Sequence, residues 1–377
     1  MLPRSLNLCC CVVASAIRQR KWGAQQGGAT SGRGSAQNGH DPGRRRERER
    51  PEIRWTAKKR ALRAVLPDDV RQVSVGESVR RCILTNFDQT ALWHRVDVTR
   101  IVTCDMAFLV REPAELVMQV VAASSAGHVE EERFDVLTDG EPPSSMAEVG
   151  DPEGATMHII RSDPGHLTVT YRARIRSSTT KPRESANHSS AADVGDRQTY
   201  ERQVYLRPSR YCPSEHLVGF AVAEFGTGPD MGKRICRIAE WIRQRIEYVP
   251  GSGTVHDSAE DTLLTGEGTC RDFAHLGIAL CRATGVPARF AAVYAPGLDP
   301  MDFHAVFEAF ENGRWYVHDP TGLAPRASLV RIATGRDAAD AAFAAVTRGL
   351  ADLQSVDVTA VAEPFLLDDV RQLLQLA

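Results

Sequence analysis

The chain has 377 residues, of which 42% are hydrophobic and 25% are charged. This usage is typical of a soluble globular protein with room for two domains, rather than of a disordered or fibrous chain. The formal net charge of −2 hides a division, because residues 1–63 hold 15 Lys and Arg against 4 Asp and Glu, which leaves 31 against 44 in the remainder. Phosphate binding needs a basic folded surface, so the acidic body argues against nucleic acid as a partner.

Cysteine usage and hydropathy bear on the compartment. Nine cysteines are scattered along the chain with no C-x-x-C pair, which favours a reducing compartment over a disulfide framework, and we expect a cytoplasmic protein. The longest apolar run, residues 6–17, is shorter than a membrane span, so no span is expected. That run weakly resembles a signal peptide, but it is rich in cysteine, and secretion is the less favoured alternative.

The first segment, residues 1–63, is predicted to be a disordered basic leader. Residues 25–50 are rich in Gly, Ser, Gln and Arg and cannot bury enough apolar surface to order themselves. Two interpretations stay open for it: a leader without function, or a tail that binds an anionic surface.

A β-rich N-terminal domain is predicted over residues 92–176. Its apolar segments, such as 116–121 and 167–173, are short, rich in β-branched residues and bounded by Gly, Pro and Asp, which predicts antiparallel strands. Residues 177–199 are rich in Ser, Asp and Arg and have no apolar period, so they are predicted to be a linker without regular structure. No pattern in the β-rich domain decides between binding and simple stabilisation.

The apolar period becomes helical in residues 200–345, which we assign as a catalytic domain. Helices are predicted over residues 213–225 and along the isoleucine-rich stretch 235–246. Residues 346–377 are assigned as a C-terminal extension.

Two further helices are predicted around Cys270, one that ends just before it and one that begins with it. A short helix over residues 258–264, capped by Ser258, ends at Gly266, and a second helix over residues 270–283 begins at Cys270. Backbone N–H groups at a helix N-terminus stabilise a thiolate, the form in which cysteine attacks a carbonyl carbon. Free cysteines are otherwise small buried apolar groups. That interpretation is the one given to Cys82, Cys104, Cys236 and Cys281.

A hairpin then predicts a histidine–carboxylate pair. Residues 288–294 and 303–310 read as strands, and Asn312-Gly313 marks a two-residue turn. With that turn, facing residues sum to 625, which makes His304 and Asp319 diagonal neighbours on one face. A carboxylate at this distance can hold an imidazole in one tautomer.

The same register separates the two histidines of the hairpin. His318 faces Phe307 on the opposite side, so it cannot replace His304 without a register slip. Taken singly, His304 also fits a buried core histidine and Asp319 a turn residue before proline. A metal site built from these groups and Cys270 lacks the paired local spacing of structural zinc sites, so no metal or other cofactor is expected.

Three motifs together resemble the transglutaminase-like superfamily, in particular bacterial members with a β-rich N-terminal region. They are GTCRDFAHL at residues 268–276, FHA at 303–305 and WYVHDPT at 315–321, in the order Cys, His, Asp. The resemblance covers about residues 204–342. It implies an α+β, papain-like core, in which the helix bearing the cysteine packs on an antiparallel sheet.

The resemblance also implies roles that agree with those argued from the residues: Cys270 as nucleophile, His304 as acid and base, and Asp319 as the orienting carboxylate. The expected reaction is acyl transfer on a peptide or amide bond through a thioester, with a peptide or protein as substrate and hydrolysis as the default outcome. The backbone N–H of Cys270 can donate to the oxyanion, while the second donor is not identified.

Two alternatives remain beside hydrolysis. Amine transfer to protein glutamine is less favoured, because no tryptophan lies between Trp241 and Trp315 to match the indole that animal transglutaminases use beside the oxyanion. A non-catalytic binding or scaffold module that retains the fold is the other alternative, since a fold alone does not establish an activity. The oligomeric state is not predicted.

Overall fold

The computed structural model describes residues 6–8, 97–178, 191–369 and 372–376. The predicted basic leader lies outside the described residues except for the short strand β1 (Leu6–Leu8). None of the described helices combines the length and the apolar character that a membrane crossing requires.

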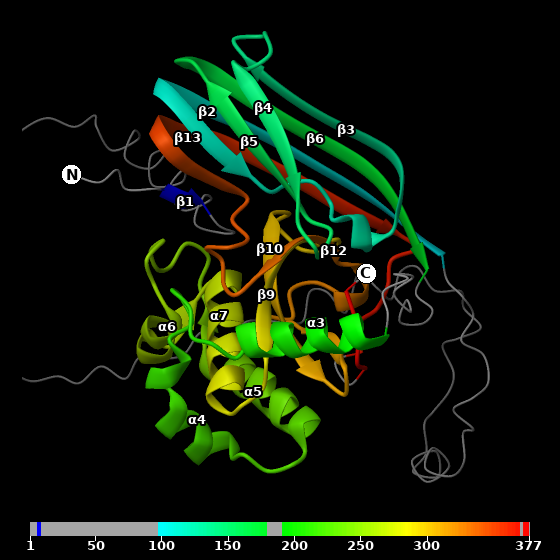
Figure 1. Cartoon of the computed structure of the whole chain (residues 1–377), viewed down its shortest axis with the longest axis vertical. Coiled ribbons are helices and arrows are strands. Elements are labelled where there is room, and N and C mark those ends of the chain that lie inside the picture. The colour runs from blue at the N-terminus through cyan, green and yellow to red at the C-terminus, as the bar shows by residue number, and fades with distance from the viewer. Residues whose placement is uncertain (1–5, 9–96, 179–190, 370–371, 377) are drawn as a thin grey trace, which may run out of the picture. The chain divides into compact units, whose positions relative to one another are not determined.

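A large antiparallel sheet forms the β-rich region (Figure 1). Its central strand β2 (Asp97–Met118) pairs along one edge with β13 (Ala344–Glu363) and along the other with β6 (Gly165–Ser178) and then β5 (Thr156–Ser162). The remaining members are β1, β3 and β4: β1 pairs with β13, β3 (His128–Thr138) with β6, and β4 (Ser145–Gly150) with β5.

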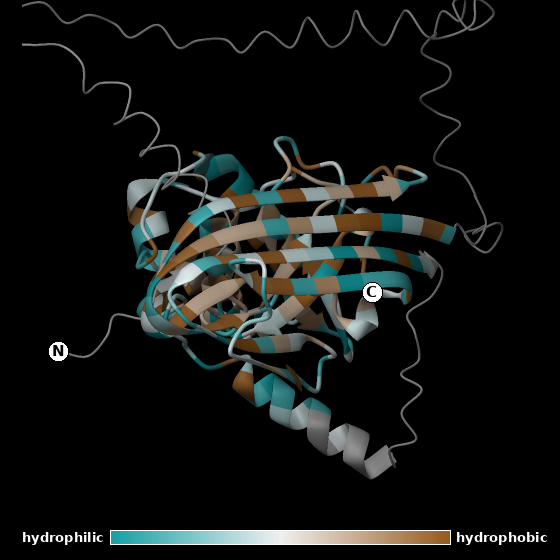
Figure 2. Ribbon diagram, turned by 90° about the horizontal axis from the view of Figure 1, so that it is seen from above, coloured by the Kyte–Doolittle hydropathy of each residue, from teal (hydrophilic) through white to brown (hydrophobic). Residues whose placement is uncertain are grey.

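Burial along β2 alternates between covered and partly exposed residues, as expected for a strand with one face on a core. Figure 2 shows the corresponding alternation of hydrophobic and hydrophilic bands along the strands. The covered face belongs to one continuous apolar cluster that also contains buried residues of the segment 200–345. The buried residues that β2 contributes to it include Val102, Cys104, Met106, Phe108 and Val110.

The last long strand comes from the segment predicted to be a C-terminal extension. Most of β13 lies within residues 346–377, and it pairs with β2 from Thr99 to Met118. Several register shifts, such as the one between Val346 and Arg348, interrupt its period of two. Bulges of this kind hide the strand pattern from a reading of the sequence, because the side-chain alternation restarts at each one.

Part of the predicted linker is helical, which corrects the expectation of no regular structure there. Helix α3 (Ala191–Val204) covers its second half, while residues 179–190 lie outside the described residues. The helix has no apolar stripe, since its few apolar residues do not gather on one side. Sequence periodicity therefore gave no signal, although Ala, Glu, Gln and Arg all favour helix.

Residues 200–345 form a core of the α+β class, as predicted, in which helices pack on a small antiparallel sheet. Its helices are α4 (Val218–Phe225), α5 (Met231–Arg245), α6 (Ala259–Thr265) and α7 (Cys270–Ala283). Its four-stranded antiparallel sheet has the order β11 (Arg314–His318), β10 (Phe303–Glu311), β9 (Ala288–Tyr294) and β12 (Val330–Gly335). Short elements complete it: η6 (Ser214–His216), η7 (Arg326–Ser328), and the parallel pair β7 (Glu247–Tyr248) and β8 (Glu267–Gly268).

Helix α7 packs directly on this small sheet (Figure 1). Gly277 allows the close approach, because a Cβ at this position would lie 2.5 Å from the Phe307 ring. The opposite side of the sheet has its own apolar cluster, which includes Val306, Val317 and Leu376. The sheet that carries the predicted histidine is therefore covered on both faces.

Candidate active site

Helix α7 begins at Cys270, as predicted. Thr269 is the N-cap residue, and it forms a capping box with Asp272: the backbone N–H and the hydroxyl of Thr269 donate to Asp272 Oδ2 at 2.9 and 2.8 Å. A capping box satisfies N–H groups that the helix itself leaves without partners. It fixes Cys270 at the first helical position, and the Cys270 residue is fully buried.

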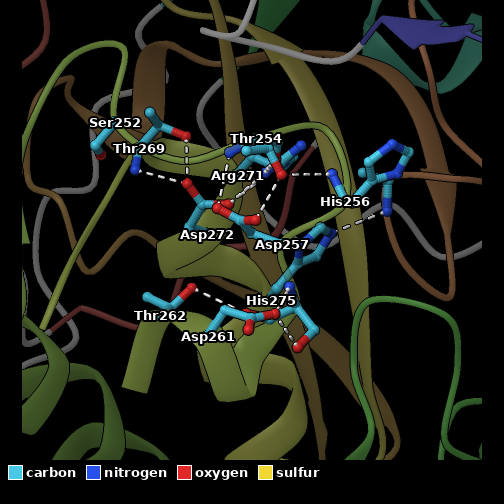
Figure 3. A network of polar contacts seen from close by, with 12 residues as sticks. Ser252, Thr254, His256, Asp257, Asp261, Thr262, Thr269, Arg271, Asp272 and His275 are labelled. Carbon is cyan, nitrogen blue, oxygen red and sulfur yellow. Dashed lines mark hydrogen bonds and ion pairs between the residues drawn. The ribbon is translucent and has the colours of Figure 1, made fainter. Parts of the chain in front are cut away.

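The second oxygen of Asp272 holds a buried arginine (Figure 3). Arg271 donates to Asp272 Oδ1 from Nε at 3.0 Å and from Nη2 at 2.7 Å, and Nη2 also donates to the Thr254 carbonyl at 2.7 Å. Its guanidinium also lies 5.8 Å from the centre of the Tyr211 ring. Asp272 is therefore engaged in capping and charge compensation, which accounts for its presence without a catalytic role.

The loop before α6 is attached through the same arginine. Thr254 donates from its backbone N–H and its hydroxyl to the two oxygens of Asp257, at 2.7 and 2.6 Å, which folds this loop on itself. His256, in the same loop, is exposed. The Arg271 contact with the Thr254 carbonyl links this loop to the start of α7.

The predicted hairpin register is confirmed. Phe307 faces His318 across β10 and β11, and the turn residues Asn312 and Gly313 both have positive φ, of 50° and 81°. Such values are typical of the two-residue turn that fits the strand twist. The register brings the His304 and Asp319 side chains together.

The two side chains form a buried hydrogen-bonded pair. His304 Nε2 lies 2.9 Å from Asp319 Oδ2, with side-chain exposures of 0% and 1%. Burial acts to raise the pKa of Asp319, but the charge and hydrogen bond of His304 and the hydrogen bonds from Thr321 outweigh it, so the pKa lies below its ordinary value. An ionised carboxylate only accepts hydrogen bonds, so Nε2 carries the hydrogen in this pair.

His318 lies on the other face of the hairpin, as the register requires. Its ring stacks on Phe307 with centroids 5.3 Å apart, and no group in the described part of the chain forms a hydrogen bond with its buried Nε2. Burial, assisted by Arg326, lowers the pKa of His318 to about 3. This histidine is a neutral packing residue.

His275, although part of the matched motif, also has a structural role. Its Nε2 accepts a hydrogen bond from the Ala338 backbone N–H at 3.1 Å, and its ring stacks on Tyr211 at 5.1 Å. Burial and the charges of Arg271 and Arg282 hold the pKa of His275 well below the usual range. It joins α7 to the loop that follows β12.

The other buried cysteines match the interpretation as apolar groups. Burial raises the pKa of Cys212 and of Cys281 to about 12, and it raises the pKa of Cys104 further. These three side chains are thiols at neutral pH and cannot act as nucleophiles. Cys236, which was also expected to be buried, is exposed on α5, so that expectation was wrong, and Cys82 lies outside the described residues.

The structure thus places the three predicted residues as follows. His304 and Asp319 are in direct contact, and Cys270 occupies the first position of α7, which packs on the strand that carries His304. The predicted roles of the three residues stay predictions. Within the described part of the chain, no group of three or more His, Cys, Asp or Glu side chains is arranged to hold a metal ion.

Sequence reasoning missed two polar groups in the hairpin and the turn that follows it. Thr321 donates twice to Asp319 Oδ1, a contact that the sequence DPTG suggests only as a turn. Glu308 lies buried among Arg289 and Arg331, with contacts of 2.8 Å to each. The strand alternation puts Glu308 on the same face as His304, so a buried charge could have been suspected there.

Three comparisons relate the chain to known proteins. A family model described as the transglutaminase-like superfamily matches residues 221–320. A crystal structure from Cytophaga hutchinsonii, described as that of a candidate cysteine protease, is 32% identical, covers 74% of this chain and 96% of that chain, and has a TM-score of 0.62.

The curated relatives are uncharacterized proteins. One from Mycobacterium leprae is 27% identical over 197 residues, which are 50% of this chain and 70% of that protein. One from Mycobacterium tuberculosis is 34% identical over 119 residues, which are 27% of this chain and 38% of that protein. Because the chain spans nearly all of the solved relative, and the family model falls on the part that carries all three predicted site residues, the chain belongs to the transglutaminase-like superfamily, and its fold and relatives support a cysteine-dependent enzyme.

Proposed function

We propose that this protein catalyses cysteine-dependent acyl transfer on peptide or amide bonds, with hydrolysis as the outcome. Cys270 is the nucleophile, His304 the acid and base, and Asp319 the carboxylate that orients His304. The observation that supports this assignment most directly is the buried 2.9 Å contact between His304 Nε2 and Asp319 Oδ2.

The reaction would run in two balanced halves. The Cys270 sulfur attacks the amide carbonyl carbon and forms a C–S bond, while the imidazolium of His304 gives a proton to the leaving nitrogen as the C–N bond breaks. The amine departs and a thioester remains. His304 then takes a proton from water, whose oxygen forms a C–O bond as the C–S bond breaks. The acid departs, and the thiolate and the imidazolium are restored.

The local electrostatics favour this sequence of steps. The positive end of the α7 dipole at Cys270 stabilises the thiolate, and the ionised Asp319 stabilises the imidazolium. Because His304 Nε2 faces Asp319, Nδ1 is the ring nitrogen that would exchange protons with the sulfur and the substrate. The backbone N–H of Cys270 is the donor proposed for the oxyanion.

We prefer hydrolysis to amine transfer because the tryptophans that precede and follow Cys270 in the sequence, Trp241 and Trp315, both pack against other aromatic rings. Trp241 lies in an aromatic cluster with Phe220 and Phe225, and Trp315 packs on Tyr205 and Phe310. We therefore assign neither indole N–H as a hydrogen-bond donor to the oxyanion. The candidate cysteine protease of Cytophaga hutchinsonii supports a peptide or protein as the substrate class.

The compartment is a further part of the proposal. None of the five cysteines in the described part of the chain forms a disulfide: Cys104, Cys212, Cys236, Cys270 and Cys281. Cysteines outside disulfides suit a reducing compartment such as the cytoplasm.

The test measures thiol activation without a known substrate. Iodoacetamide alkylation is followed by mass spectrometry from pH 5 to 10 on the wild type, on His304→Ala and on Cys270→Ala. Cys236 is an internal control, because it is exposed and its pKa is raised by burial and by Glu311. We expect the alkylation of Cys270 to show an apparent pKa well below the ordinary thiol value of about 8.5. In His304→Ala the apparent pKa of Cys270 should return towards that ordinary value.

Equal pH profiles for Cys270 and Cys236, unchanged by His304→Ala, would contradict the proposal and favour the non-catalytic module. With an activated thiol in hand, peptide cleavage and the incorporation of a fluorescent amine into casein distinguish the two acceptors. Cleavage without incorporation supports hydrolysis, and Cys270→Ala should lower it by at least about 10³-fold.

A further inference from the structure

The turn after β11 does more than reverse the chain. Asp319, Pro320, Thr321 and Gly322 follow β11 directly, with proline at the second turn position, where its fixed φ is favourable. Thr321 reaches back to the Asp319 carboxylate with two donors, its backbone N–H at 2.9 Å and its hydroxyl at 2.6 Å. Both donate to Oδ1, while Oδ2 faces His304.

The direction of the hydroxyl hydrogen follows from a third contact. The backbone N–H of Leu323 donates to Thr321 Oγ1 at 3.2 Å, so this oxygen is already an acceptor. A hydroxyl has one hydrogen, and the ionised Asp319 carboxylate can only accept. The Thr321 hydroxyl therefore donates to Asp319, in a hydrogen bond strengthened by the negative charge.

Besides the Leu323 contact to this hydroxyl, two further contacts hold the turn. The Thr321 backbone N–H already closes it, and Arg243 Nη2 donates to the Asp319 carbonyl at 3.2 Å. Arg243 also packs over Gly322, where a Cβ would lie 3.1 Å from Nη1. With the backbone fixed from two sides, the hydroxyl acts on the rotation and charge of the carboxylate.

We propose that Thr321 is a positioning residue, which rests on the function proposed above: its hydroxyl fixes the Asp319 carboxylate so that Oδ2 faces His304. Without the hydroxyl, Oδ1 keeps one donor, and the carboxylate can rotate away from the imidazole. His304 then loses its fixed tautomer, and the imidazolium that accompanies the thiolate loses stabilisation. The thiolate population at a given acidic pH falls.

The test compares Thr321→Val, which keeps the shape and the backbone N–H, with Thr321→Ser, which keeps the hydroxyl. Thr347→Val is the matched control, because the Thr347 hydroxyl also donates to a carboxylate, Glu115 at 2.9 Å, on the exposed sheet. The readouts are the pH profile of Cys270 alkylation, the melting temperature, and ¹⁵N NMR of the histidine ring nitrogens, which reports the tautomer.

We expect Thr321→Val to slow alkylation at pH 6 by about 10-fold and to move the profile upward by about one pH unit. Thr321→Ser and Thr347→Val should follow the wild type. A wild-type profile and tautomer for Thr321→Val would overturn the proposal. So would a loss shared equally by Thr321→Ser, because the hydroxyl would then not be the cause.

Two outcomes keep this proposal separate from the function on which it rests. If His304→Ala leaves Cys270 alkylation unchanged, the proposed function fails. If His304→Ala acts but Thr321→Val does not, only the role of Thr321 fails. Should Thr321→Val melt more than about 5 °C below the wild type, Thr321→Ala replaces it in the same comparison, and the tautomer of its folded form decides the outcome.

Discussion

The ion pairs of the large sheet are exposed to solvent, whereas the α+β core of residues 200–345 contains buried ones. On the sheet, Arg172 and Asp105 pair at 3.2 Å with side-chain exposures of 56% and 45%. In the core, Arg289 and Arg331 each contact Glu308 at 2.8 Å, and all three side chains are 6% exposed or less. The sheet buries apolar residues on its inner face, and its ion pairs are exposed to solvent.

This difference implies that ion pairs fix side-chain positions in the core but not on the large sheet. Exposed ion pairs contribute little, because water screens them and both side chains lose freedom. Buried charges cost desolvation energy and persist only with full partners, so each one holds its neighbours in one arrangement. The core contains two such sets, Arg271 with Asp272, which directly follow Cys270, and Glu308 with its arginines.

The largest expected effect concerns the boundary between the two regions. A chain of residues 200–345, the predicted catalytic domain, should lack a cooperative thermal transition, because the core and the sheet share one apolar cluster. Tyr294 would lose its stacking on Tyr171 and its 2.6 Å hydrogen bond to the Val120 carbonyl. Calorimetry against the full chain measures this, and a transition within a few degrees of the full chain would show that the core folds by itself.

The next effect comes from the buried core charges. Burial tends to raise the pKa of Glu308, but Arg289 and Arg331 outweigh it and hold the pKa at about 2. Glu308→Gln leaves Arg331 without its carboxylate and Arg289 with Glu153 alone, so we expect the free energy of unfolding to fall by about 3–5 kcal/mol. Urea titration at pH 7 measures it. A loss below about 1 kcal/mol would contradict the distinction between the two regions.

A smaller effect depends on pH. The folded-state pKa of His318 is lowered to about 3, so below about pH 6.5 the unfolded chain binds a proton that the folded chain excludes. Stability from this residue is present above pH 6.5 and falls as the pH drops towards 3. His318→Phe should flatten the dependence by up to about 1.4 kcal/mol per pH unit. Urea titrations at pH 4.5, 5.5 and 6.5 test this, and parallel curves for both proteins would refute it.

The smallest effect belongs to the sheet. Asp105→Asn removes the exposed partner of Arg172, and the free energy of unfolding should change by no more than about 0.5 kcal/mol. The same urea titration serves as the control for Glu308→Gln. A loss comparable to that of the buried variant would mean that the sheet also depends on its ion pairs.

Local patterns predicted much of the core. The start of α7 at Cys270 follows from the capping box of Thr269 and Asp272, and the His304–Asp319 pair follows from the turn at Asn312-Gly313. These features depend on neighbours a few residues apart, so propensity, capping and register suffice to predict them.

Only the tertiary structure decided the rest. The pairing of β13 with β2 joins residues more than 200 positions apart, and its bulges conceal the alternation that would mark a strand. Likewise, the burial of Glu308 and the direction of the Thr321 hydroxyl depend on which distant groups surround them. The sequence by itself determined the helix start and the hairpin register, because these are short-range properties. The partners that fix the charges and the strand that completes the sheet were decided by long-range packing, which a local pattern does not encode.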